Sequence, residues 1–169
     1  MFLTIFTLAH VAISLIGIGS GCVVMFGLLM RRIFKGWTRL FLVTTIATSV
    51  TGFGFPFVKF LPSHAVAILS LLLLTLTVLA LYRFQLAGSW RWIYVITATL
   101  SFYFNVFVLV IQAFEKIDAL KALAPTQSEP PFAVAQLVVL AVFVLMGTLA
   151  VIRFPGNALE RPVQAAAAR

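Results

Sequence analysis

The sequence predicts an all-α, polytopic transmembrane helical bundle of five membrane-spanning helices, with the N-terminus outside and the C-terminus in the cytoplasm. Three observations predict this. Hydrophobic residues make up 63% of the 169 residues and charged residues only 9%, whereas a soluble globular protein carries about 25% charged residues. The apolar residues fall into five long stretches. The basic residues gather at the ends of these stretches, mostly on one side.

The five apolar stretches account for nearly the whole chain, which indicates one domain. Each has roughly 18 to 29 residues, enough to cross a hydrocarbon core about 30 Å thick at about 1.5 Å per residue. Lipid offers no hydrogen-bond partners, so the backbone of each stretch must be satisfied within a helix. The stretches cover residues 2–30, 40–57, 65–84, 92–114 and 132–154, and a short polar cytoplasmic tail follows at 155–169.

The sequence also predicts the nature of the segments between these stretches. No basic residue precedes the first stretch and a positive cluster follows it, so we expect an uncleaved helix rather than a removable signal peptide. Prolines end the second stretch, because proline cannot continue a helix without losing a hydrogen bond. A re-entrant segment at 51–57, which leaves four full crossings, stays an alternative. The longest connection, 115–131, holds three prolines and is either a lid or a stiff connector.

Basic residues are divided unequally between the two sides of the predicted bundle. Nine fall on one side and three on the other, and the side with more Lys and Arg is cytoplasmic. The three are Lys59, Lys116 and Lys121; the nine are Arg31, Arg32, Lys35, Arg39, Arg83, Arg91, Arg153, Arg161 and Arg169. This distribution predicts the N-out, C-in orientation.

The net charge of +8 does not indicate a nucleic-acid partner. The basic residues lie at the ends of apolar segments, where they can reach lipid headgroups, and they form no basic face with interleaved aromatic residues. The lipid bilayer is therefore the expected partner, with a second copy of the chain or a membrane partner protein left open. Cys22 is the single cysteine, which excludes an intramolecular disulfide and a cysteine-rich metal site.

Polar residues inside the apolar stretches gather on three of the predicted helices. Counted at about 1.5 Å per residue from the outer end of each helix, His10, Thr51 and Asn105 fall at about the same depth. Polar side chains in a membrane usually face other helices or a cavity, so we predict a polar pocket in the outer half of the bundle. Its candidate ligand-binding residues are His10, Ser14, Thr48, Thr51, Asn105, Gln112 and Gln136, with His64, Glu115 and Glu129 at the outer rim. Interhelical hydrogen bonding without a ligand is the competing interpretation.

No recognisable catalytic constellation is present, so an enzyme is the less favoured interpretation and no catalytic residue is assigned. His10 and His64 differ in predicted depth by about 12 Å, which makes bis-histidine haem ligation unfavourable. A single haem b held by His10 remains an alternative, although no cofactor is predicted. No metal site is predicted, because three or four ligands are required. No charged residue lies at the midplane, yet transport of a neutral solute stays open.

Four short sequence patterns resemble small, uncharacterised bacterial multi-pass membrane proteins. They are Gly-Trp-Thr at 36–38, Thr-Gly-Phe-Gly-Phe-Pro-Phe at 51–57, Trp-Arg-Trp-Ile-Tyr-Val at 90–95 and Ala-Pro-Thr-Gln-Ser-Glu-Pro-Pro-Phe at 124–132. The resemblance implies a bacterial inner (cytoplasmic) membrane location and transfers no functional residue. The function expected is that of a non-enzymatic subunit or a small-ligand-binding bundle.

Overall fold

The computed structural model describes residues 2–55 and 62–154, and every regular element in that range is helical, as the sequence predicts. Four helices are long and apolar enough to cross a bilayer: residues Leu3–Leu29, His64–Arg83, Trp90–Lys116 and Pro130–Arg153. These are the features of a helical membrane protein. In chain order the elements are α1 (Phe2–Leu29), α2 (Lys35–Gly52), α3 (Pro62–Val78), the π-helical η1 (Leu79–Arg83), α4 (Trp90–Lys116), α5 (Asp118–Leu123) and α6 (Pro130–Arg153).

The second helix differs most from its predicted range of 40–57. α2 begins at Lys35 and ends at Gly52, and residues 56 and 57 lie outside the described part of the chain. The apolar run alone placed the start too late, because Lys35 and Arg39 extend the helix without being apolar. Their long side chains can reach water from a helix end, so they do not have to terminate it. α2 is also less apolar than the other four long helices.

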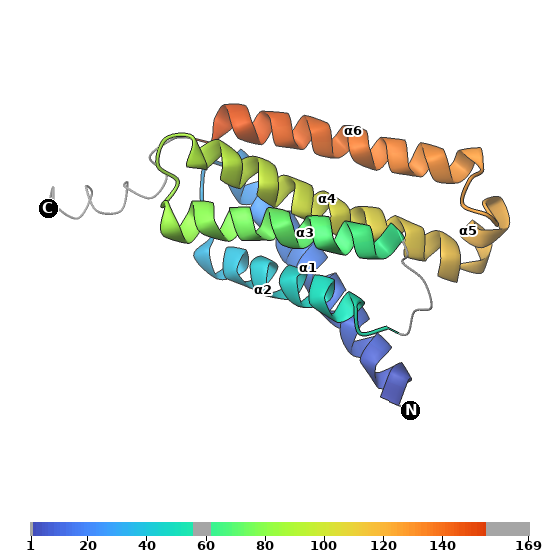
Figure 1. Cartoon of the computed structure of the whole chain (residues 1–169). Coiled ribbons are helices and arrows are strands. Elements are labelled where there is room, and N and C mark those ends of the chain that lie inside the picture. Colours follow the sequence, from blue (N-terminus) through green and yellow to red (C-terminus); the bar gives the residue numbers. More distant parts are fainter. Residues whose placement is uncertain (1, 56–61, 155–169) are drawn as a thin grey trace, which may run out of the picture.

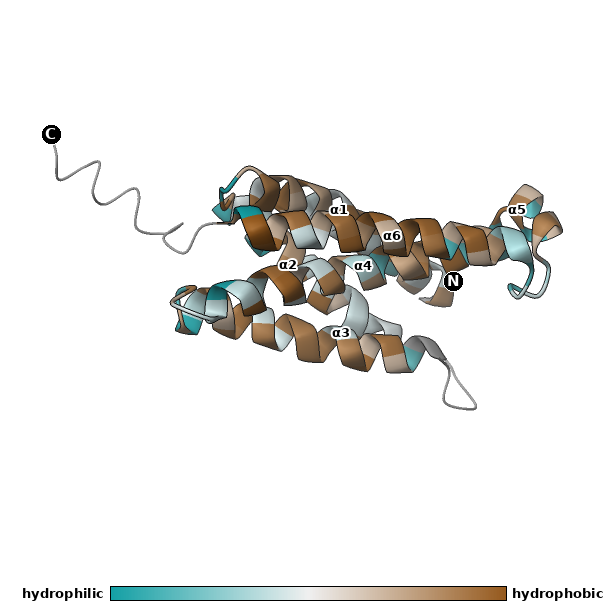
Figure 2. Ribbon diagram, turned by 90° about the horizontal axis from the view of Figure 1, so that it is seen from above, coloured by the Kyte–Doolittle hydropathy of each residue, from teal (hydrophilic) through white to brown (hydrophobic). Residues whose placement is uncertain are grey.

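Consecutive long helices run antiparallel, and α4 lies between α3 and α6 (Figure 1). α1 and α2 form the most extensive helix pair, and α1 also contacts α4 and α6. The connection between the fourth and fifth predicted stretches, expected to be a lid or a stiff connector, contains the short helix α5. Hydrophilic residues gather near the two ends of the bundle, and hydrophobic residues cover most of its length (Figure 2).

Aromatic rings fill the centre of the bundle. Phe102 of α4 is 5% exposed, and its ring packs edge-on against Phe41 of α2 and Phe143 of α6, with centroids 6.2 Å and 5.0 Å away. Gly21 of α1 lies directly against the same ring. Four helices therefore meet at Phe102, and the missing side chain of Gly21 makes room for it.

Hydrogen bonds made by side chains also link the helices. The Thr77 hydroxyl of α3 lies 2.8 Å from the Thr97 hydroxyl of α4. At the basic end, the Arg91 guanidinium donates to the carbonyl of Phe154, which joins the start of α4 to the end of α6. The Thr97 hydroxyl accepts from the Thr77 hydroxyl and donates its own hydrogen to the carbonyl of Ile93, one turn back in α4, so it is satisfied in an apolar medium.

Candidate functional site

His10 and Thr51 of the predicted pocket are in direct contact. The Nδ1 atom of His10 on α1 lies 2.8 Å from the hydroxyl oxygen of Thr51 on α2. One turn further along, the Ser14 hydroxyl lies 3.3 Å from the Thr48 hydroxyl. Four of the predicted site residues thus form two adjacent polar pairs at the α1–α2 interface.

The Thr51 hydroxyl has two close neighbours. Its oxygen lies 2.8 Å from Nδ1 of His10 and 2.7 Å from the carbonyl oxygen of Ala47. A hydroxyl has one hydrogen to donate and must accept with its lone pairs. Both contacts are satisfied together in the tautomer whose Nδ1 donates to Thr51, and in that neutral ring Nε2 keeps its lone pair. Nε2 has no hydrogen-bond partner in the described part of the chain.

Aromatic rings form the wall beside this histidine. The Phe55 ring packs edge-on against the His10 ring, with centroids 5.1 Å apart, and against the Phe6 ring at 5.0 Å. Gly54 permits this approach, because a Cβ there would lie 2.7 Å from the Phe6 ring. The result is a basic nitrogen acceptor next to an apolar aromatic wall, where the turn after α2 meets α1.

Asn105 does not lie at the level of His10, so the predicted depth match is wrong for this residue. Its amide nitrogen donates to the Thr45 hydroxyl at 3.1 Å and lies close to Gly17. Thr45 precedes Thr51 by six residues, or about 9 Å along the helix. The estimate failed because α2 ends at Gly52 and not at residue 57, so Thr51 lies in the last turn of the helix, at its outer end. Asn105, Thr45 and Gly17 form a second polar layer where α1, α2 and α4 converge.

The two glutamines of the predicted pocket are separate from the histidine. Gln112 is exposed. The Gln136 amide nitrogen on α6 donates to the carbonyl of Phe107 on α4 at 3.2 Å, and its buried Oε1 has no partner. Gln136 therefore joins α4 to α6 and does not extend the α1–α2 site.

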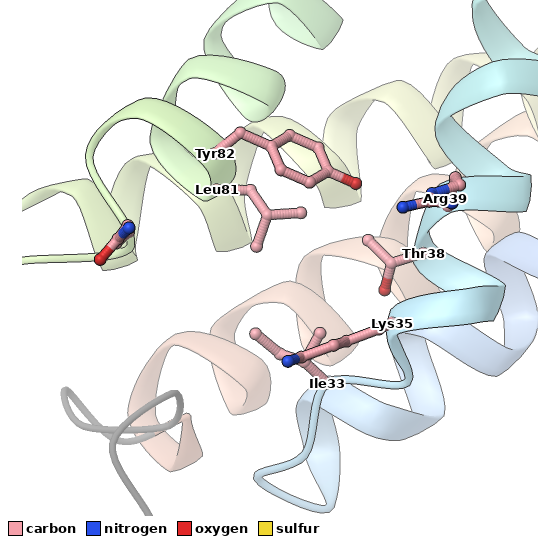
Figure 3. A pocket seen from close by; sticks show the side chains of 7 residues that line it. Ile33, Lys35, Thr38, Arg39, Leu81 and Tyr82 are labelled. Atoms are coloured by element: carbon pink, nitrogen blue, oxygen red, sulfur yellow. The ribbon is translucent and has the colours of Figure 1, made fainter. Parts of the chain in front are cut away.

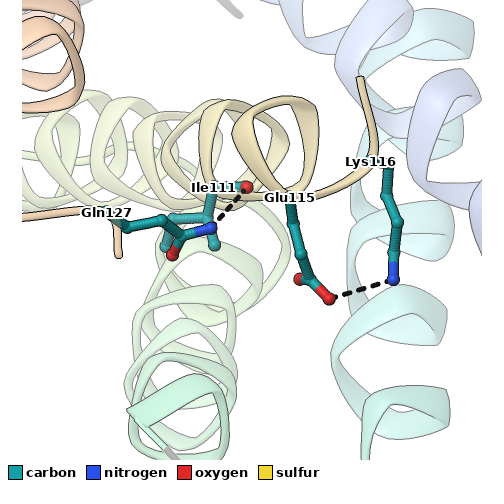
Figure 4. A network of polar contacts seen from close by, with 4 residues as sticks. All are labelled: Ile111, Glu115, Lys116 and Gln127. Carbon is teal, nitrogen blue, oxygen red and sulfur yellow. Dashed lines mark hydrogen bonds and ion pairs between the residues drawn. The ribbon is translucent and has the colours of Figure 1, made fainter. Parts of the chain in front are cut away.

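The three predicted rim residues also occupy different places. His64 is 5% exposed and stacks on Phe53, with ring centroids 5.6 Å apart. Glu115 makes an exposed ion pair with Lys116 at 2.9 Å, close to the hydrogen bond from Gln127 to the carbonyl of Ile111 (Figure 4). The Glu129 carboxylate accepts hydrogen bonds within its own turn, from the Thr126 hydroxyl at 2.9 Å and the Ser128 backbone at 3.1 Å.

Sequence reasoning missed a pocket at the opposite, basic end of the bundle. It measures about 370 Å³, and Figure 3 shows Arg39 and Thr38 of α2 opposite Tyr82 of η1. Lys35 and Gln85 also line it. The Lys35 and Arg39 pair was available as a signal, since residues four apart share a helix face. The opposite wall of the pocket, on η1, depends on a π-turn that no sequence pattern predicted.

Across the residues that the structure describes, no three His, Cys, Asp or Glu side chains come together as metal ligands. No protein-family model, curated protein or solved structure matches this chain. The inference about function therefore rests on the residues themselves.

Proposed function

We propose that this chain is a bacterial inner-membrane protein of five spans, N-out and C-in, that acts by binding as a non-enzymatic subunit or small-ligand-binding bundle. Its site is His10 with the Thr51 and Phe55 side chains around it. The ligand is a small molecule that donates a hydrogen bond to Nε2 of His10 and lays an apolar surface on Phe55.

The arrangement of charge supports the five-span topology. All described basic residues of the predicted cytoplasmic side belong to the end where α1 and α6 finish and α2 and α4 begin. The three described acids, Glu115, Asp118 and Glu129, belong to the opposite end. α2 runs antiparallel between the two ends beside α1 (Figure 1). The hydroxyl groups of Thr44 and Thr51 are placed to donate to helix carbonyls one turn back, which lowers the cost of placing them in lipid.

The single observation that carries the ligand-binding proposal is the contact of His10 Nδ1 with the Thr51 hydroxyl, beside the Phe55 ring. The Thr51 hydroxyl accepts from Nδ1 and so leaves Nε2 as a half-buried acceptor beside an aromatic wall. A histidine that served only to join α1 to α2 needs one nitrogen. The second nitrogen is available for a ligand, and removing one such hydrogen bond costs about 1 kcal/mol, or roughly fivefold in affinity.

Native mass spectrometry of the purified protein tests this proposal. The wild-type chain should retain a small molecule that His10→Phe loses and that Thr51→Val holds more weakly. Thr7→Val is the matched control, because Thr7 is exposed on the same helix and its hydroxyl donates to the Leu3 carbonyl. A small molecule retained equally by wild type and His10→Phe would contradict the proposal, and so would its absence from both.

A single haem b on His10 is the second candidate, because a neutral imidazole with a free Nε2 is also a haem ligand. The absorption spectrum of protein prepared with haem supplied decides between the two. A Soret band that disappears in His10→Phe supports haem binding. Its absence leaves the organic ligand or a partner subunit, which the same mass spectra identify.

A further inference from the structure

The interface between α2 and the α3–η1 helix contains two pockets in succession. The first, of about 370 Å³, lies at the basic end between Lys35, Thr38 and Arg39 of α2 and Leu81 and Tyr82. The second, of about 250 Å³, lies deeper. Both lie along the interface of the same two helices, and together they are called the α2–α3 groove below.

The section of this groove at the basic end of the bundle is positively charged, and its cations make no ion pair with described residues. Neither Lys35 nor Arg39 makes an ion pair in the described part of the chain, where Glu115–Lys116 is the one pair. Figure 3 shows the Tyr82 hydroxyl and the Arg39 guanidinium directed toward each other across the opening. Gln85 also lines the pocket. Two cations with a phenol and an amide are a donor set for a phosphate or carboxylate group.

The second section of the groove, further from the basic end, is apolar. Ile46, Leu71, Leu74 and Val78 line it, and the hydroxyl of its remaining polar residue, Thr75, is occupied by the Leu71 carbonyl at 2.8 Å. Ile46 follows Arg39 by seven residues, which places this section about 10 Å further along the helix. An acyl chain spans that distance from a headgroup, whereas a soluble anion has no use for an apolar extension.

We propose that this groove is a binding site for one anionic amphiphile, a phospholipid whose phosphate lies between Lys35, Arg39 and Tyr82 and whose acyl chain follows the α2–α3 interface. The charge selects the headgroup, and the apolar section selects a lipid over a free anion. The site is separate from His10, which lies at the other end of the bundle, so either proposal can fail alone.

Native mass spectrometry with added lipid measures this binding directly. The detergent-solubilised full chain is titrated with phosphatidylglycerol and with phosphatidylcholine of the same acyl chains. We expect the anionic lipid to bind about tenfold more tightly. The double variant Lys35→Gln/Arg39→Gln should weaken its binding roughly 30-fold, which corresponds to about 1 kcal/mol for each basic residue.

A matched charge control separates the pocket from the general positive field. Arg32→Gln/Arg153→Gln removes the same charge from the same end but touches neither pocket, and should change the affinity less than about threefold, because exposed charges are screened. Thr75→Phe, which fills the apolar section of the groove, tests whether the acyl chain lies there. Leu76→Phe on the same helix is its control, because Leu76 does not line the pocket. Thr75→Phe should weaken lipid binding about tenfold, the equivalent of about two buried methylene groups.

Three outcomes would overturn the proposal. Equal affinity for the two lipids removes the headgroup site. Equal losses from the two double charge variants indicate attraction by net charge alone. If inorganic phosphate competes as strongly as phosphatidylglycerol, and Thr75→Phe has no effect, the pocket is a site for soluble anions and not for lipid.

Discussion

Replacing Gly21 with alanine is the sharpest test of the packing at the centre of the bundle. A Cβ at Gly21 would lie 2.5 Å from the nearest ring carbon of Phe102. The ring cannot move aside easily, because Phe41 and Phe143 hold it from α2 and α6. Gly19 is the natural control, since a Cβ there meets nothing within 4 Å.

The comparison of the two alanine variants isolates the steric cost. Both substitutions gain the same helix-propensity term of about 1 kcal/mol, so this term cancels in the difference. Inserting a methyl group into a well-packed core costs about 1–3 kcal/mol. Gly21→Ala should therefore be about 1–3 kcal/mol less stable than Gly19→Ala.

Equilibrium unfolding in mixed micelles with increasing sodium dodecyl sulfate, followed by circular dichroism, measures both variants. Gly17→Ala should fall between them, because its Cβ would lie 3.3 Å from the Thr44 hydroxyl, a tight but not forbidden distance. If Gly21→Ala unfolds at the same detergent fraction as Gly19→Ala, α1 does not approach Phe102 as described, and the four-helix contact is wrong.

Three further outcomes can be measured independently. Gln136→Leu should leave the free energy of unfolding unchanged or raise it by about 1 kcal/mol. The substitution removes a buried unpartnered oxygen along with one hydrogen bond of about 0.6 kcal/mol. A large loss of stability in the same micelle assay would contradict this. Desolvation acts to raise the pKa of Glu129, but hydrogen bonds from its own backbone, Thr126 and Ser128 outweigh it and lower the pKa below its ordinary value. The charged carboxylate thus stabilises the turn at pH values above the ordinary pKa, and this stabilisation is lost as the pH falls through the lowered pKa. NMR of the carboxyl carbon should show that the pKa of Glu129 rises in Thr126→Val, and an unchanged pKa would refute this. In a background without the native cysteine, Ser128→Cys should react with a membrane-impermeant maleimide on intact cells and Ala87→Cys only after permeabilisation; the reverse pattern would invert the proposed topology.

Most of the fold was predictable because long apolar runs leave the backbone no alternative to a helix. The helix ends were less predictable, as α2 shows: Lys35 and Arg39 belong to a helix whose apolar part begins later. The His10–Thr51 contact followed from helical spacing and depth. The position of Asn105 relative to Thr51 did not, because α2 ends at Gly52, earlier than its apolar run indicates. The basic-end pocket was missed because it requires η1, whose π-turn sets the direction of Tyr82.

The shallow seating of α6 has a consequence for how this chain can vary. Only 11% of its membrane-spanning window is buried in the bundle. Its buried positions are few: Phe143 and Ala150, with Gly147 close to Thr99 of α4. At the exposed positions of this helix any apolar side chain meets lipid equally well, so leucine, valine and isoleucine are interchangeable there. A deep mutational scan of α6 should show a requirement for shape at fewer positions than the same scan of α4, whose membrane-spanning window is 39% buried.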